Sequence, residues 1–171
     1  MDTTPEPNRR WHQYALRWPL LCALLLALLC GWFAVKMEQA RRQKALVEEI
    51  ENVGGLVWRD YQFDADGSLL TKDPQPPGPA WLRRVLGDDF FMNVVKLDLT
   101  QTEIGDAGLE HLKGLPHLQS LYLGTEVTDA GLAHLKGLTE LRYLNLSRTH
   151  VTDAGVQGLQ KALPHCTIRR P

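Results

Sequence analysis

The sequence lacks the marks of several large protein classes. Nineteen Lys and Arg residues balance 20 Asp and Glu residues, so the net charge is −1 and gives no argument for a nucleic-acid partner. Three scattered cysteines fit neither a disulfide framework nor a zinc site. There is no phosphate-binding loop and no dinucleotide fingerprint, because the glycine pair within 53–56 is too short for either. We therefore expect no nucleic acid, no cofactor, no metal and no small-molecule substrate.

Reactive side chains are present but do not form a catalytic group. His111 and His134 recur at equivalent positions, but neighbouring helices lie about 8–10 Å apart and a zinc ion needs nitrogens within about 2.1 Å. Residues 88–89 are two aspartates beside two phenylalanines, which suits a turn or cap before a strand. Ser120 and Ser147 have no nucleophile elbow or nearby base. We therefore predict that the protein is not an enzyme.

A long apolar run is the main feature of the N-terminal part. Residues 18–35 carry no charge, and as a helix they would span about 27 Å, close to the roughly 30 Å hydrocarbon core of a bilayer. Aromatic residues flank the run in the manner of the aromatic belts of a membrane span: Trp11, Tyr14 and Trp18 lie on one side and Trp32 on the other. We predict an uncleaved membrane anchor over 18–35, preceded by a short basic tail over 1–17.

Three other interpretations of this run are weaker. A cleaved signal peptide would need small residues at its cleavage site, and Trp32 stands two before Ala34. A lipoprotein would need a small residue before Cys30, where the sequence has Leu29. A buried soluble helix is disfavoured by apolar residues all round and by basic flanks. Basic residues before and after the run nearly balance, so the positive-inside rule only weakly favours repeats on the extracytoplasmic side.

The segment 36–93 is predicted to join the anchor to the C-terminal half and to cap it. Residues 36–52 are strong helix formers, and the glycines at 54–55 signal a stop. Residues 56–63 read as a strand that could extend a neighbouring sheet, 64–67 as a turn, 72–79 as a proline-rich loop, and 80–86 as a short amphipathic helix.

The C-terminal half contains an internal repeat. Residues 128–138 nearly repeat 105–115, and a more divergent copy follows at 152–159. The matching aspartates, Asp106, Asp129 and Asp153, are 23 and 24 residues apart. A period of this size predicts a stack of units that bury their apolar faces only against one another. We place the stack over 94–171, with units at about 94–117, 118–140 and 141–165 and a closing strand.

Each part of the shared frame Leu-x-x-Leu-x-Leu-x-x-Thr-x-Val has a predicted place. Leucines two apart point from a short strand into the core: Leu97 and Leu99, Leu121 and Leu123, Leu144 and Leu146. Apolar residues after the turn follow them inward: Ile104, Val127 and Val151. The three aspartates are predicted helix N-caps. Pairs three apart face the strands from the helix: Leu109 and Leu112, Leu132 and Leu135, Val156 and Leu159. Left-handed Gly114 and Gly137 are predicted to end the first two helices, and with Ala162 at that place the third helix should run one residue longer.

This frame resembles the leucine-rich repeat family, and the segment Thr-Asp-Ala-Gly-Leu resembles its ribonuclease-inhibitor-like and cysteine-containing types. Thr102, Thr125 and Thr149 stand where that family carries Asn or Cys, whose side chain satisfies turn backbone groups. Residues 163–168 resemble the terminal strand of such stacks. The whole chain resembles short bacterial membrane-anchored leucine-rich-repeat proteins. The resemblance implies an α/β solenoid, with parallel strands on one side and helices on the other, whose concave face binds protein.

Two functions from different classes follow. The first is a single-pass membrane protein, anchored in the bilayer through 18–35, whose repeats bind a protein partner. The second is a structural cell-envelope element that self-associates. The candidate protein-binding residues are the outward strand positions and a neighbouring arginine: Lys96, Asp98, Ser120, Tyr122, Tyr143, Asn145 and Arg148. Tyr122 and Tyr143 are either part of a binding patch or an ordinary cross-strand pair.

Overall fold

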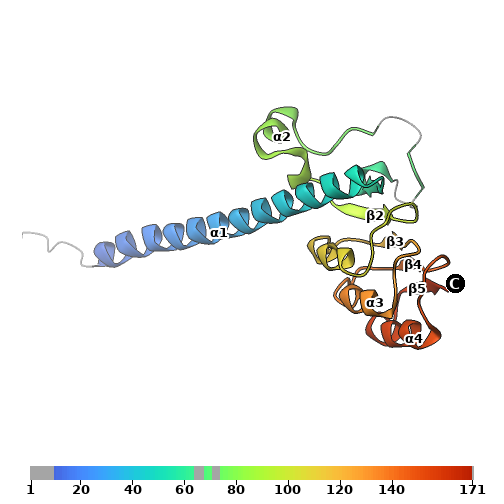
Figure 1. Ribbon diagram of the computed structural model, residues 1–171. Coiled ribbons are helices and arrows are strands. Elements are labelled where there is room, and N and C mark those ends of the chain that lie inside the picture. The colour runs from blue at the N-terminus through green and yellow to red at the C-terminus, as the bar shows by residue number, and fades with distance from the viewer. Residues whose placement is uncertain (1–9, 64–67, 71–73, 171) are drawn as a thin grey trace, which may run out of the picture. The chain divides into compact units, whose positions relative to one another are not determined.

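A computed structural model describes residues 10–63, 68–70 and 74–170, with side chains described from residue 19 onward (Figure 1). The chain divides into two compact units, Met1–Glu38 and Gln39–Pro171, and helix α1 contains the boundary. The elements in chain order are α1 Arg10–Asn52, β1 Leu56–Arg59, the 3-10 helix η1 Asp60–Gln62, α2 Ala80–Leu86, η2 Asp88–Phe90, β2 Val94–Asp98, η3 Gly108–Gly114, β3 Ser120–Tyr122, α3 Asp129–Leu135, β4 Tyr143–Asn145, α4 Asp153–Ala162 and β5 Thr167–Arg169.

The first unit is helical, and its described side chains up to Val35 are exposed and apolar. Leu24, Leu26 and Leu29 are each exposed by 60% or more. By length and composition, the part of α1 from Pro19 onward is the one helix of the described chain that could cross a membrane. Trp32 of the expected aromatic belts is 59% exposed, whereas the side chains of Trp11, Tyr14 and Trp18 lie outside the described residues.

In the second unit, the end of α1 covers the first layer of the repeat core. Val47 and Ile50 are buried in the same apolar cluster as the repeat leucines, and the buried Gln43 side chain donates a hydrogen bond to the Met92 carbonyl (3.0 Å). A Cβ added at Gly114 would lie 2.5 Å from Leu46 Cδ1, so the missing side chain lets the helix approach closely. The helix ends as predicted: Gly54 has φ 85° and the Gly55 N–H donates to the Ile50 carbonyl (2.9 Å).

The strand expected over 56–63 is shorter than predicted. β1 ends at Arg59, because the chain then turns through η1, where the Asp60 carboxylate accepts hydrogen bonds from the Tyr61 N–H and from Asn93 Nδ2. β1 pairs antiparallel with β2 and so extends the sheet, as the sequence suggested. The predicted helix over 80–86 is α2, with Pro79 at its N-cap. The turn predicted over 64–67 and the start of the predicted loop over 72–79 lie outside the described residues.

The repeats form one sheet of order β1-β2-β3-β4-β5, parallel from β2 onward. Figure 1 shows these strands in succession on one side of the unit, with η3, α3 and α4 on the other. Leu97, Leu121 and Leu144 are direct register partners, and each is 0% exposed. The inward leucines therefore form a continuous core from rung to rung. Of the three residues predicted to follow them inward, Val127 and Val151 are buried, but Ile104 is only half-buried.

The helices of the three units differ more than the sequence suggested. The first is a 3-10 helix, η3, because Gly105 stands where Thr128 and Thr152 cap the two α-helices with their hydroxyls. The prediction of left-handed Gly114 and Gly137 is wrong, since neither has a positive φ. The helix α4 extends to Ala162, three positions beyond the equivalent end of α3 rather than one.

The repeated aspartates are not N-caps; Asp106 and Asp129 instead link one repeat to the next. Asp106 accepts hydrogen bonds from the backbone N–H (2.8 Å) and hydroxyl (2.5 Å) of Thr128. Asp129 binds Thr152 in the same way, at 2.8 and 2.6 Å. The repeat period is therefore visible twice, in the apolar core and in this Asp–Thr series at its edge.

The Asp–Thr series ends at the third unit, and glycines in α3 and α4 make room for its carboxylates. Asp153, the aspartate of the third unit, pairs instead with the Arg170 guanidinium at 3.1 Å. A Cβ added at Gly131 or Gly155 would collide with the carboxylate of Asp106 or Asp129, respectively. The glycine of each Thr-Asp-Ala-Gly segment in α3 and α4 thus leaves room for the preceding aspartate.

The frame threonines behave as expected in two units of three. Thr102 and Thr149 donate from their hydroxyls to the carbonyls of Leu99 (3.0 Å) and Leu146 (2.8 Å). Thr125 is exposed and donates to the Glu126 side chain instead (3.4 Å). The second unit is one residue short before Thr125, so this turn has a different path.

Candidate functional site

The candidate site is the outward face of the sheet, where side chains from successive strands align in two rows. The first row follows the register of Lys96: Trp58, Lys96, Ser120, Tyr143 and Thr167. The second row follows the register of Asp98: Leu56, Asp98, Tyr122, Asn145 and Arg169. We call these two rows the open sheet face. They bring together six of the seven residues that the sequence predicted, and Arg148 follows directly in the turn after β4.

Aromatic rings and one lysine dominate the β1 to β4 part of this face. The ammonium group of Lys96 lies 4.7 Å from the centroid of the Trp58 ring and 5.2 Å from that of Tyr122. The Tyr122 and Tyr143 rings are 5.5 Å apart with an interplanar angle of 49°. These distances are typical of cation–π and aromatic pairs. The four side chains therefore form a connected strip, with Tyr122 and Tyr143 as diagonal neighbours rather than direct register partners.

The polar residues of the second row help to shape the turns after the strands. Asp98 accepts hydrogen bonds from the N–H (2.9 Å) and hydroxyl (2.6 Å) of Thr100. Asn145 Oδ1 accepts from the Ser147 N–H at 2.9 Å, at the equivalent place on β4, on the other side of β3. Both side chains thus hold the chain two residues downstream, a common role for Asx side chains. The Oδ1 atom of each side chain is therefore in use before any ligand binds.

The environment of Tyr122 keeps its hydroxyl protonated. Partial burial first, and then Tyr143 and the Asp98 carboxylate, raise the pKa of Tyr122. Each of these causes disfavours the phenolate. The Tyr122 hydroxyl thus ionises even less readily than that of an ordinary tyrosine, which is already neutral at neutral pH, and it can donate a hydrogen bond.

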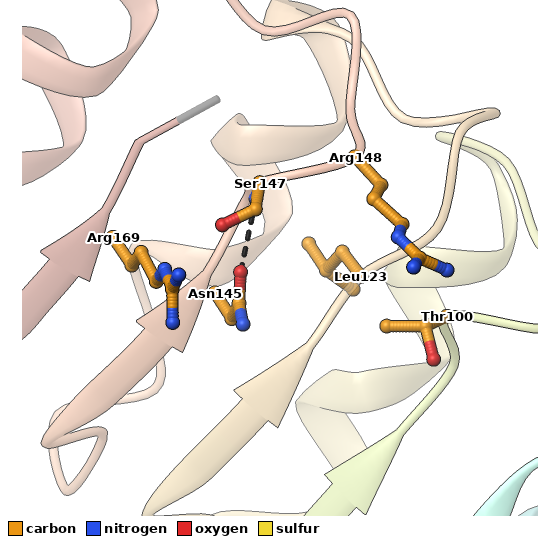
Figure 2. Close-up of a pocket in the computed structure, with 6 residues that line it drawn as sticks. All are labelled: Thr100, Leu123, Asn145, Ser147, Arg148 and Arg169. Carbon is orange, nitrogen blue, oxygen red and sulfur yellow. Dashed lines mark hydrogen bonds between the residues drawn. The ribbon is translucent and has the colours of Figure 1, made fainter.

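A hollow of about 330 Å³ lies beside the strip, where the strands end. Its lining residues come from the ends of four strands and the turns after them: Thr100, Leu123, Asn145, Ser147, Arg148 and Arg169. Figure 2 shows the Arg169 and Arg148 side chains on opposite sides, with Asn145 and Leu123 between them. The hollow thus combines two guanidinium groups, an amide and two hydroxyls.

Sequence reasoning missed two important members of this face. Trp58 joins it only because β1 pairs antiparallel with β2, and Arg169 only because β5 continues the sheet past the third repeat. The expected strand character of 56–63 could have indicated Trp58. Arg169 follows the segment 163–168 that resembles a terminal strand. Among the described residues, no group of His, Cys, Asp and Glu could hold a metal ion.

Comparison with known proteins bears on the repeats. A family model described as Leucine Rich repeat matches residues 92–113 and 138–159. No curated protein matches the chain. The two matched repeats support a leucine-rich repeat family, and the mixed α/β structure with its five-stranded sheet fits the fold of that family. Repeats of this family suggest a protein-interaction module, and the family is generally a non-catalytic fold.

Proposed function

We propose that this chain is a single-pass membrane protein that displays a small leucine-rich-repeat module for binding another protein through its open sheet face. The observation that carries the proposal is the connected strip of Trp58, Lys96, Tyr122 and Tyr143. Trp and Tyr are enriched among the residues that dominate binding energies at protein interfaces. The strip lies on a face that helices η3, α3 and α4 leave open (Figure 1).

The anchoring part of the proposal rests on α1. Its side chains from Leu20 to Val35 are apolar and exposed. Exposing so much apolar surface to water would be unfavourable, whereas a bilayer would accept it. We place the tail of 1–17 on the cytoplasmic side and the repeats on the other side, following the common arrangement of signal-anchors. Protease added to intact cells should then remove the repeats; if they survive intact, this orientation is wrong.

The binding part is tested by crosslinking the full chain in detergent-solubilised membranes and identifying its neighbours. Tyr122→Ala combined with Tyr143→Ala should strongly reduce capture of a specific neighbour, since both rings are removed from the centre of the face. A matched control is Tyr61→Ala, because Tyr61 lies in η1 and belongs to neither row. Capture that is unchanged by the double substitution would remove the strip from the proposal. Capture of further copies of this chain alone would favour the self-associating envelope element instead.

A further inference from the structure

The hollow at the strand ends contains positive charge that no described residue of this chain neutralises. Among the described residues, neither Arg148 nor Arg169 has a carboxylate within 4.0 Å, whereas Arg170 is paired with Asp153. The nearest acidic member of the second row, Asp98, is already bound by two groups of Thr100. Lys96 is held between two aromatic rings. The two arginines are therefore the available charges of this part of the face.

Of the remaining polar groups of the hollow, the Asn145 amide adds a donor, whereas the Thr100 and Ser147 hydroxyls already donate to Asp98 Oδ1 and to the Arg170 carbonyl. The Ser147 N–H donates to Asn145 Oδ1, which fixes the amide so that its Nδ2 group is the free end. In Figure 2 that nitrogen lies beside the Arg169 side chain, and the Arg148 guanidinium reaches toward Thr100. A guanidinium is a planar fork of N–H donors that matches the two oxygens of a carboxylate. The donors therefore favour an oxyanion such as a carboxylate.

The position of the hollow indicates where that carboxylate comes from. Arg169 and Asn145 are register partners, and Asn145 is the register partner of Tyr122. Adjacent strands are about 4.8 Å apart, and an extended peptide advances about 3.3 Å per residue. A segment crossing the strands would thus place a residue over the tyrosines and another, two or three positions away, over the hollow.

We infer that the hollow between Arg148 and Arg169 binds an Asp or Glu side chain of the protein partner, next to a residue that packs on Tyr122 and Tyr143. This inference rests on the proposed function and names the chemistry of the partner. Arg148 and Arg169 are both exposed in the free protein, so binding requires little rearrangement of the fold. Charge pairs at such a position are screened by salt, and affinity should fall as ionic strength rises.

The test is an unbiased selection. The full chain in a non-ionic detergent is incubated with a library of random hexapeptides on beads, at about physiological salt where the Debye length is about 8 Å. Selected peptides should be enriched in Asp and Glu relative to the library, and their synthetic copies should bind about tenfold more weakly to Arg148→Gln combined with Arg169→Gln. Arg142→Gln is the matched control, because Arg142 is exposed and precedes β4, at the opposite strand end. Circular dichroism melting of each variant verifies folding.

The outcomes separate this inference from the function on which it rests. Peptides without acidic enrichment, whose binding depends on Tyr122 and Tyr143, would overturn the acidic-residue inference and keep the interaction module. Acidic peptides that bind the double Arg variant as well as the wild type would also overturn it. If no library bead retains more protein than beads without peptide, the result would contradict both the acidic-residue inference and the interaction module.

Discussion

Replacing Leu121 with alanine would place a cavity at the centre of the repeat core. Leu121 is 0% exposed, and its register partners on both sides, Leu97 and Leu144, are also 0% exposed. Leu→Ala changes in cores cost about 2–5 kcal/mol, and the cost rises when the surroundings cannot collapse. The partners of Leu121 are fixed in hydrogen-bonded strands, so we expect a value in the upper half, about 3–5 kcal/mol. Small domains have only about 5–15 kcal/mol of stability in total.

Thermal unfolding of the full chain in detergent, followed by near-UV circular dichroism of the aromatic strip, measures this loss. A loss of that size should lower the melting temperature by about 9–25 °C, since each kcal/mol corresponds to about 3–5 °C for a unit of this size. The matched control is Leu69→Ala, because Leu69 is 56% exposed and should melt close to wild type. If Leu121→Ala melts within a few degrees of Leu69→Ala, the rung-to-rung core described above is incorrect.

Two further predictions concern the Asp–Thr series. Gly155→Ala should destabilise the folded protein by about 1–3 kcal/mol, because the added methyl group would collide with the Asp129 carboxylate. The control Gly158→Ala, in the same helix, places its methyl group in open space and should stabilise the fold by about 0.5–1 kcal/mol. Urea titrations that give the two variants equal stability would contradict the Asp–Thr series. Burial would raise the pKa of Asp106, but the side-chain and backbone hydrogen bonds from Thr128, the Gly131 N–H and the charge of His134 together lower it below 3.8. Because the folded-state pKa is depressed, this carboxylate stabilises the fold above its unfolded pKa of about 4 and loses that effect as the pH falls through the folded-state pKa. The free energy of unfolding of the wild type should therefore decrease when the pH drops below about 4. An equally steep decrease in Asp106→Asn would refute this role of Asp106.

The sequence predicted the core well because its signal is local. Leucines two apart in a short strand must share a face, and all three pairs, such as Leu97 and Leu99, are buried. The predicted site residues of β2, β3 and β4 follow from the same alternation, since Lys96 and Asp98 flank Leu97. For these three strands, the position of a residue on the open sheet face could therefore be predicted without the structure.

What could not be predicted depends on partners distant in the sequence. A carboxylate at the start of a helix usually indicates an N-cap, but Asp129 binds Thr152, 23 residues away, and this contact appears only when the repeats are stacked. Gly114 suggested a left-handed helix end, but its small size makes room for Leu46 of α1. The Arg148 and Arg169 hollow was missed because β5 had to be added to the sheet before Arg169 could reach it.

Site-specific photocrosslinking tests the central claim, that the open sheet face binds a protein. A photoreactive amino acid is placed at Ser120, between Lys96 and Tyr143 in the first row, and in a second variant at Ala133, exposed on α3. Irradiation of the full chain in its native membrane should give a defined adduct with another protein from position 120 and none from position 133. The same adducts from both positions, or an adduct from position 133 alone, would contradict the claim.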